Sequence, residues 1–428
     1  MQKKGLSLFA LVMIAIGSTI GSGVFKTPTD IAKNVPDIGG MHFLWILGGL
    51  VSMIGALVFA ELGRRYANAG GVYSYLQNTW GPLPAFLYGW CLLTVVSSGT
   101  IAALIVVFVD FIQKFIPFSD SSKGIIAAVS IVVLTLFNTF SLKSSEWFAN
   151  VATVLKMIGI FGLIILLLVL GQDAVGATNV AASSNSEMNW AGAFVGVLWS
   201  YTGWHYASFV SGDAKNPQRD VPIAMIVGTL MVTLIYVLCN WGYLHVLSVD
   251  EMIASKTLAA DAAEKVIPHS GWMVSLLIAL SVFGCAGLYV LATPRIIQQM
   301  SKEGFFFPIF SNAHPKYGVP LNAIMLQSIW AIVLVFFWGG FEQLFTYVTI
   351  TEWFFLLMTC VGFVMLLVKN NEWNEKRNLI YMVLAVLFST VVTWFIFKNA
   401  TSDNPAAYYG LLVIPVGVLF YFWMKKSK

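Results

Sequence analysis

The fold is decided by the stretch IAIGSTIGSGVFKTPTDIA, residues 14–32, which lies inside the first apolar segment of the chain. Gly17, Gly21 and Gly23 fall within about two helical turns of one another, and Ser22 lies between the last two. A membrane helix can unwind at such a point and offer bare backbone N–H groups to a ligand. In transporters, interrupted helices of this kind form substrate sites. The alternative interpretation is a glycine seam for close helix packing, and these residues alone leave both open.

The composition predicts an all-α integral membrane protein. Of the 428 residues, 58% are hydrophobic and only 10% are charged, which excludes an ordinary soluble domain. The apolar runs are continuous over about twenty residues, so they predict membrane-spanning helices and not the alternating strands of a barrel. Twelve spans are expected, at 8–33, 41–63, 84–112, 124–141, 148–170, 191–211, 221–245, 272–298, 321–338, 343–368, 378–397 and 407–424.

The basic residues predict the orientation of these spans. Of the 24 Lys and Arg residues, sixteen lie at span ends that share a side with the N-terminus, seven lie at the opposite ends, and Lys156 lies within a span. Positive charges mark cytoplasmic loops. We therefore expect a multi-pass protein of the cell membrane with both termini in the cytoplasm. No signal-peptide cleavage site follows the first apolar run, and of the long polar connections, 171–190 and 246–270, the second is expected to carry a short surface helix.

Several functional classes find no support in the chain. The four cysteines, Cys91, Cys239, Cys285 and Cys360, all fall within expected spans, so they are expected to be small apolar core residues. The absence of a Gly-x-x-x-x-Gly-Lys-Ser/Thr run argues against ATP-driven transport. The five histidines are scattered and form no His-Glu-x-x-His pattern, so we expect neither an enzyme nor a metal or other cofactor.

A second interruption is predicted in the sixth span. Gly203 lies about midway along this run, between hydroxyl residues that permit a break and aromatic residues that can close over a ligand: Ser200, Thr202, Trp199, Tyr201 and Trp204. Breaks in the first and sixth spans are what an inverted repeat of five spans plus five produces. An aromatic belt at the membrane interface is the alternative, although these residues lie deep within the run.

The same residues resemble a known family. Residues 17–25, GSTIGSGVF, followed by Thr27 and Pro28, resemble the first-span signature of the amino acid–polyamine–organocation superfamily. Residues 199–224, WSYTGWHYASFVSGDAKNPQRDVPIA, resemble the sixth-span signature of its L-type amino acid transporter branch, in particular the bacterial exchangers of small amino acids. Further agreement lies at 60–63, 69–73, 294–295, 303–304 and 314–320, so the resemblance extends over the whole chain.

The resemblance implies a LeuT-like fold and an amino acid carrier that works by alternating access. Residues 1–428 would form one transporter domain, in which 8–170 and 191–368 are the two inverted halves and 378–424 are two peripheral helices. Exchange of one amino acid for another is expected. Proton-coupled symport and a substrate-sensing receptor on a transporter fold remain open alternatives.

The physical chemistry of an amino acid fits the two breaks. Its carboxylate suits the positive end of the helix that restarts at Gly23, with the N–H groups of Ser22 and Gly23 as donors. Its ammonium suits the carbonyls freed near Ile16, Gly17, Trp199 and Thr202. The expected substrate-binding residues are Ile16, Gly17, Thr19, Gly21, Ser22, Gly23, Trp199, Ser200, Thr202, Gly203 and His205.

Lys156 lies about a third of the way into the fifth span, where an ammonium is costly unless carbonyls bind it. The resemblance implies that this lysine takes the place of a sodium ion beside the broken first span, and hence that transport is sodium-independent. The alternative is a lysine that snorkels to the cytoplasmic face. Tyr236 resembles a tyrosine that members of the branch place beside the first-span glycines.

Two further groups could titrate inside the membrane. Glu352 lies near the centre of the tenth span, where a carboxylate either couples protons or is a structural acid bonded to hydroxyls such as those of Thr349 and Thr351. His205 could sense pH or form hydrogen bonds in the pocket, and substrate contact is the preferred interpretation. The expected coupling and gating residues are Lys156, Trp199, Tyr201, Tyr236 and Glu352.

The expected substrate is a small or medium neutral amino acid, such as alanine, serine or threonine. Trp199 occupies the position of the superfamily's aromatic gate, and together with Tyr201 and Thr202 it leaves little room for a bulky side chain. The expected partners are this substrate and the lipid bilayer. Eukaryotic members of the resembled branch bind a heavy chain through a cysteine in the loop that corresponds to 113–123. This loop has none, so the resemblance implies that no disulfide-linked heavy chain is expected.

Overall fold

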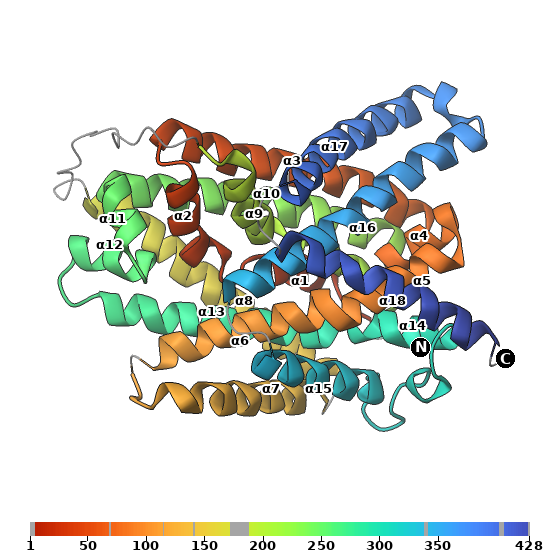
Figure 1. Ribbon diagram of the computed structural model, residues 1–428, viewed down its shortest axis with the longest axis horizontal. Coiled ribbons are helices and arrows are strands. Elements are labelled where there is room, and N and C mark those ends of the chain that lie inside the picture. The colour runs from red at the N-terminus through yellow and green to blue at the C-terminus, as the bar shows by residue number, and fades with distance from the viewer. Residues whose placement is uncertain are drawn as a thin grey trace.

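The computed structural model describes residues 5–67, 70–113, 115–139, 142–171, 188–337, 341–401 and 406–426. Within these ranges the chain is a bundle of helices (Figure 1), and extended segments meet only at a bridge between Leu6 and Ala214. The α-helices are α1 (Leu8–Thr19), α2 (Gly23–Asn34), α3 (Ile38–Arg65), α4 (Val72–Trp80), α5 (Pro82–Cys91), α6 (Ser97–Ile112), α7 (Lys123–Thr139), α8 (Leu142–Ile165), α9 (Trp190–Tyr201), α10 (Pro217–Val246), α11 (Val249–Ala254), α12 (Leu258–Val266), α13 (Gly271–Ala292), α14 (Pro294–Lys302), α15 (Leu321–Phe337), α16 (Phe341–Lys369), α17 (Lys376–Ala400) and α18 (Ala406–Lys426). Short π-helical turns are η1 (Leu92–Val96) and η3 (Leu166–Leu170), and short 3-10 turns are η2 (Asp120–Ser122), η5 (Trp204–Ser208), η6 (Ser211–Asp213), η7 (Pro308–Phe310) and η8 (Glu372–Asn374).

Nine helical segments of the described chain are long and apolar enough to cross a membrane. They are Leu8–Asn34, Ile38–Arg65, Pro82–Ile112, Asp120–Thr139, Asn150–Leu170, Pro217–Val246, Gly271–Lys302, Leu344–Lys369 and Lys376–Ala400. Each coincides with an expected span. The other three expected spans contain α9, α15 and α18, and α15 reaches only 17 residues. A multi-pass helical membrane protein is therefore confirmed, and the count of twelve crossings stays a prediction.

The first span is interrupted where its glycines predict. The Ser7 hydroxyl caps α1 by accepting a 3.2 Å hydrogen bond from the Ala10 N–H, and the helix continues to Thr19. Ile20 then takes an extended ψ of 90°, and α2 starts at Gly23. The sixth span is interrupted in the same way, because α9 ends at Tyr201 and the chain continues as the short turn η5.

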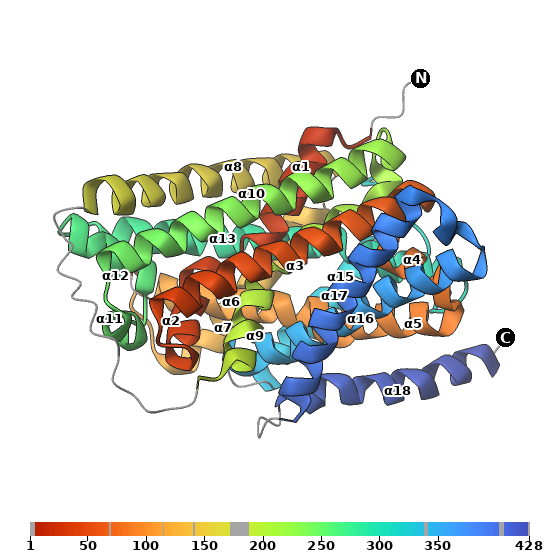
Figure 2. The same cartoon turned by 90° about the horizontal axis from the view of Figure 1, so that it is seen from above.

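These two breaks lie in the centre of the bundle. The helix α1 packs against α8, α10, α13 and η5, and α2 packs against α9. Figure 2 shows α10 lying along α3 and α18 at the edge, and α17 lies at the upper edge in Figure 1. The apolar window of α17 is 22% buried, compared with 83% for the span that contains α1 and α2. Helices α17 and α18 are therefore peripheral, and the other helices enclose the broken spans.

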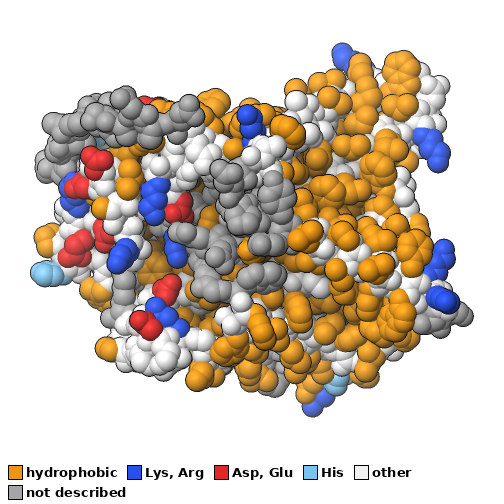
Figure 3. Space-filling view, in the orientation of Figure 1, with side chains coloured by type: hydrophobic (Ala, Val, Ile, Leu, Met, Phe, Trp, Pro, Cys, Tyr) orange, Lys and Arg blue, Asp and Glu red, His pale blue; other side chains and the backbone are white. Residues whose placement is uncertain are grey.

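The surface has the charge pattern of a membrane protein. Hydrophobic side chains cover most of the right-hand part of the face in Figure 3, and acidic side chains, together with basic ones, gather at the end that carries α11 and α12. The start of α1 and the end of α18 both lie toward the opposite end, on different sides of the bundle (Figures 1 and 2). The connection 246–270 contains two helices, α11 and α12, where one was expected. Most of the connection 171–190 lies outside the described residues.

Candidate substrate site

The two broken spans touch backbone to backbone at Gly203 and Ser18. Gly203 has a φ of +131°, which side chains other than that of glycine rarely permit. A Cβ atom at this position would lie only 2.6 Å from the Ser18 carbonyl oxygen. The Ser18 hydroxyl donates a 3.0 Å hydrogen bond to the Gly203 carbonyl. Glycine is therefore required at 203 so that the two breaks can approach each other.

Tyr236 of α10 holds the same two breaks from one side. Its hydroxyl lies 2.9 Å from the Thr19 carbonyl oxygen and 2.9 Å from the Ser200 carbonyl oxygen, so its single proton is shared between them. The hydroxyls of Ser200 and Thr27 are 2.8 Å apart, which joins α9 to α2. Ser200 and Tyr236 thus connect the helices around the breaks.

Lys156 of α8 holds the first break from another side. Its ammonium donates a 2.9 Å hydrogen bond to the Gly17 carbonyl and a second, very short one to the Ile20 carbonyl. The side chain is buried, with 1% of its surface exposed. Lys156 therefore binds the carbonyls that the unwound segment frees, and it does not extend to the cytoplasmic face.

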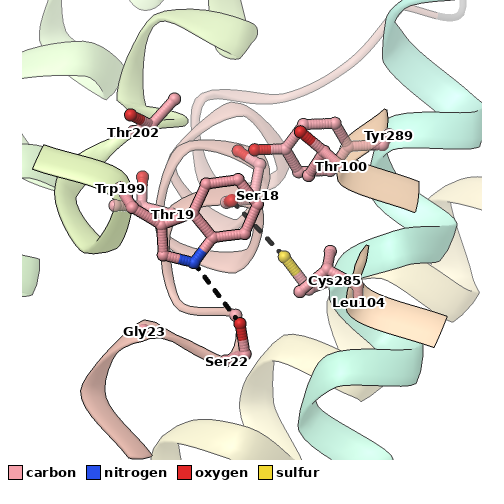
Figure 4. Close-up of a pocket in the computed structure, with 11 residues that line it drawn as sticks. Ser18, Thr19, Ser22, Gly23, Thr100, Leu104, Trp199, Thr202, Cys285 and Tyr289 are labelled. Carbon is pink, nitrogen blue, oxygen red and sulfur yellow. Dashed lines mark hydrogen bonds between the residues drawn. The ribbon is translucent and has the colours of Figure 1, made fainter. Parts of the chain in front are cut away.

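A narrow cavity lies between the breaks (Figure 4). Its walls come from the first break, from α6, from α9 with the residue after it, and from α13: Ser18, Thr19, Gly21, Ser22, Gly23, Thr100, Leu104, Trp199, Thr202, Cys285 and Tyr289. The cavity offers about 10 Å³ to the centres of water molecules. A volume of that size holds roughly one water molecule, so the cavity is too small for an amino acid in this conformation, which we call closed.

The start of α2 supplies hydrogen-bond donors to this cavity. The first backbone bonds of α2 run from Phe25 and Lys26 back to the Ser22 carbonyl. In the described part of the chain, no acceptor is bonded to the N–H groups of Ser22 and Gly23. Ser22 and Gly23 line the cavity at the positive end of a helix, which is a favourable place for a carboxylate.

Trp199 forms the aromatic cover of the cavity. Figure 4 shows its indole extending toward Ser22, whose hydroxyl accepts a 3.4 Å hydrogen bond from the indole Nε1. The Trp199 ring also contacts the Phe345 ring of α16, with 6.0 Å between the centroids. Trp199 thus bridges from the first break to α16 across the cavity.

The structure separates the expected substrate-binding residues into two sets. The residues that line the cavity are Thr19, Gly21, Ser22, Gly23, Trp199 and Thr202. The residues outside the lining are Ile16, Gly17, Ser200, Gly203 and His205. Three of the carbonyls expected to bind an ammonium are already in use: those of Ile16, Gly17 and Trp199 accept from Ile20 N–H, Lys156 Nζ and Thr202 N–H. A carbonyl oxygen has two lone pairs, so each can accept one more bond.

Sequence reasoning missed five lining residues: Ser18, Thr100, Leu104, Cys285 and Tyr289. The run Ser-Ser-Gly-Thr at 97–100 is a polar, small-residue stretch in an apolar span and could have pointed to α6. Gly284 and Gly287, on either side of Cys285, are a similar signal in α13. The Cys285 thiol donates a 3.4 Å hydrogen bond to the Ser18 carbonyl, so this cysteine reaches the break, while all four cysteines are buried and free as expected.

His205 and Glu352 form a buried pair instead of separate sites. The His205 Nε2 lies 2.7 Å from the Glu352 Oε1, and neither side chain is exposed. Thr349, one of the expected partners of Glu352, donates to the Phe345 carbonyl, and the Thr351 hydroxyl has no partner among the described residues. Tyr201 lies behind the break, where its hydroxyl donates a 2.9 Å hydrogen bond to the Trp45 carbonyl.

The bundle end that carries the start of α1 is closed by backbone and ion pairs. The Leu6 N–H donates a 2.7 Å hydrogen bond to the Asp213 carbonyl, and the Arg295 Nε lies 2.6 Å from the Asp213 Oδ2. Beyond the spans, Arg65 donates to Glu372 over 2.5 Å and so holds the pKa of Glu372 below its usual value of 4.5. No side-chain cluster suited to a metal ion occurs among the residues that were placed.

Two broken membrane helices that meet around a small closed cavity, with free N–H donors at a helix start, define a membrane transporter. The family model for amino acid permeases matches residues 6–420, and the chain belongs to that family. It is therefore an amino acid transporter and not an enzyme, as the sequence predicts.

Similar proteins cover almost the whole chain. The serine/threonine exchanger SteT of Bacillus subtilis is 28% identical over 433 residues, which cover 100% of this chain and 98% of SteT. The human b(0,+)-type amino acid transporter 1 is 28% identical over 430 residues, covering 98% of this chain and 88% of the relative. The human cystine/glutamate transporter is 27% identical over 439 residues, covering 100% and 87%.

Proposed function

We propose that this protein exchanges small or medium neutral L-amino acids across the cell membrane by alternating access and without sodium. The observation that carries the proposal is the cavity between the two breaks, which is lined by Trp199, by Thr202, and by Ser22 and Gly23, whose N–H groups bond no acceptor in the described part of the chain. One wall suits a carboxylate, and the carbonyls of the break suit an ammonium. An α-amino acid carries both groups on one carbon atom.

The lining favours a small, uncharged substrate. Leu104, Trp199 and Tyr289 take up much of the wall, and the lining contains no Asp, Glu, Lys or Arg among the described residues. A charged substrate side chain would therefore have no counter-charge there, and burying an unpaired charge is costly. A bulky substrate would require a larger displacement of Trp199. The name of the relative SteT, a serine/threonine exchanger, agrees with this preference.

The position of Lys156 supports sodium independence. Its ammonium is bonded to the Gly17 and Ile20 carbonyls, the type of oxygen ligand that a sodium ion would use at a broken helix. A second positive charge beside a buried ammonium is unfavourable. Transport at an unchanged rate after replacement of sodium by choline is therefore expected.

The proposed topology has twelve crossings, with 8–170 and 191–368 as two inverted halves and both termini in the cytoplasm. It is supported by the breaks in the first and sixth spans and by the location of the start of α1 and the end of α18 toward one end of the bundle. All four cysteines are buried, which supports a carrier that works without a disulfide-linked heavy chain.

The test is uptake of labelled alanine or serine by purified protein in sodium-free liposomes, either empty or preloaded with unlabelled amino acid. We expect uptake into preloaded vesicles only, with competition by serine and threonine but not by arginine or glutamate. Protein-free liposomes are the control. Uptake into empty vesicles driven by an inward proton gradient would make the protein a symporter, and no flux under any condition would favour a receptor.

A further inference from the structure

The pair formed by His205 and Glu352 is an acid and a base enclosed in the membrane interior. His205 lies in η5 just after the sixth-span break, and Glu352 lies in α16. The two side chains are 2.7 Å apart, and neither is exposed. One side chain follows the sixth-span break and the other belongs to a continuous helix. A change in the protonation of the pair therefore alters the contact between the break and α16.

The surroundings of the pair offer no compensating charge. The groups that interact electrostatically with the Glu352 carboxylate are Tyr88 and Cys91 of the third span, Tyr206 of η5 and Tyr289 of α13, all uncharged at neutral pH. In the described part of the chain, His205 is the only basic side chain that pairs with Glu352. Phe59 of α3 and Phe209 cover the imidazole with their rings.

Two polar atoms of the pair lack close partners. Among the described residues, the His205 Nδ1 and the Glu352 Oε2 lack a close hydrogen-bond partner, while the hydroxyl of Tyr88 interacts with Glu352 and that of Tyr206 with Tyr289. A neutral imidazole beside a carboxylate would leave one uncompensated negative charge in the membrane interior. One additional proton makes the pair neutral, either as an imidazolium with a carboxylate or as an imidazole with a carboxylic acid.

We propose that His205 and Glu352 are a proton-binding site, in which the pair holds one proton while the substrate cavity is closed. The proton is shared between the two side chains, and its loss leaves a net negative charge. Because that charge is unfavourable in this enclosed place, the pair can release its proton only as the protein opens.

Two chains of contacts connect this proton site to the substrate cavity. The Trp353 indole, next to Glu352, donates a 2.9 Å hydrogen bond to the Thr202 hydroxyl, and Thr202 lines the cavity. The Tyr206 ring lies 4.5 Å from the His205 ring and 4.7 Å from the ring of Tyr289, which also lines the cavity. A change at the cavity and a change at the proton site therefore both alter the contacts made by Thr202 and Tyr289.

The inference rests on the proposed exchange and adds a pH dependence to it. At alkaline pH the pair loses its proton, the closed conformation is disfavoured, and exchange slows, by up to tenfold per pH unit for a single proton. Glu352→Gln removes the acid, so exchange should remain constant at alkaline pH. It should instead slow at acid pH, since charging His205 would then leave an unpaired imidazolium.

The experiment measures exchange of labelled alanine into preloaded liposomes at equal internal and external pH from 5.5 to 8.5. Wild type and Glu352→Gln are compared with His42→Gln as the matched control. His42 lies in another span, where its ring contacts that of Trp241, so this variant should follow the wild-type pH profile. Identical profiles for wild type and Glu352→Gln would overturn the proton site.

A second measurement does not depend on the variant being folded or on flux. Calorimetry of alanine binding to the wild type at pH 8.5, in two buffers of different ionisation enthalpy, counts the protons taken up. Uptake approaching one proton per binding event supports the site, and zero contradicts it. If the wild type binds alanine with proton uptake but exchanges at no pH, the proposed exchange fails while the proton site stands.

Discussion

The Lys156 ammonium donates a 2.9 Å hydrogen bond to the carbonyl of Gly17, one turn before the first break. Gly17 is closely enclosed at this contact, since a Cβ atom there would lie 2.3 Å from the Thr153 hydroxyl oxygen. The fifth span thus contacts the first span through the hydrogen bond from Lys156 and through the packing of Thr153 against Gly17. Movement of α1 relative to α8 must separate both contacts. Both contacts therefore contribute to the stability of the closed conformation.

Lys156→Ala is expected to slow exchange strongly while the protein stays folded. The substitution leaves the Gly17 and Ile20 carbonyls without a donor. An unsatisfied buried acceptor costs about 1–3 kcal/mol, which corresponds to roughly 5- to 150-fold in rate. Initial rates in preloaded liposomes measure the effect, and Leu155→Ala, at an outward-facing neighbour on α8, is the control. An unchanged rate would show that Lys156 is dispensable.

Gly23→Val is expected to abolish substrate binding because the added side chain collides with α9. A Cβ atom at Gly23 would lie 2.6 Å from the Ser200 Cα atom and 2.5 Å from its hydroxyl oxygen. A side chain here therefore forces α2 away from α9, and even Gly23→Ala should weaken binding. Gly162→Ala is the matched control, because its Cβ atom meets nothing within 4 Å. Calorimetry of alanine binding gives the affinities, and normal affinity in Gly23→Val contradicts the site.

Tyr236→Phe is expected to slow exchange by roughly two- to tenfold. It removes the hydroxyl that binds the carbonyls of Thr19 and Ser200, and a typical hydrogen bond contributes about 0.5–1.5 kcal/mol. Tyr243 lies two turns later on α10, is also buried, and has no hydrogen-bond partner in the described part of the chain. Tyr243→Phe should therefore leave the rate unchanged, and equal effects of both variants would argue against a specific role of Tyr236.

The pair of Arg65 and Glu372 is expected to lose its stabilising effect in acid. Arg65 holds the pKa of Glu372 below 4.5, so the contribution is present above that pH and is lost as the pH falls below it. Because Glu372 is partly exposed, the pair is worth at most about 1 kcal/mol. The melting temperature of Glu372→Gln should lie slightly below that of wild type at pH 7.5, and the difference should shrink as the pH falls below 4.5. A constant difference would rule out this titration.

The sequence predicts the breaks well because glycine is a local signal. Gly21, Gly23 and Gly203 each mark backbone that a side chain would disturb, and each lies at an interruption. The sequence does not distinguish what each glycine is for. Gly203 is required for contact with Ser18, while Gly23 lines the cavity, and only three-dimensional packing separates these roles.

Contacts between distant spans are beyond such local reasoning. His205 and Glu352 are 147 positions apart and appear in the sequence as two unrelated groups. Tyr289 lies in a helix whose residues are apolar on all sides, so no periodicity indicates which face meets the cavity. Lys156 was recognisable because a charge inside a span requires a partner, although its partners are backbone carbonyls that no residue type reveals.

Cys285 gives this transporter a built-in chemical reporter. Its thiol is the only sulfur in the described lining of the cavity and lies 3.4 Å from the Ser18 carbonyl, while the other three cysteines lie elsewhere in the buried core. An alkylating reagent of amino acid size can reach this sulfur only when the cavity opens. The speed of its modification therefore records how often the protein opens, and protection by a bound amino acid would report occupancy without any introduced label.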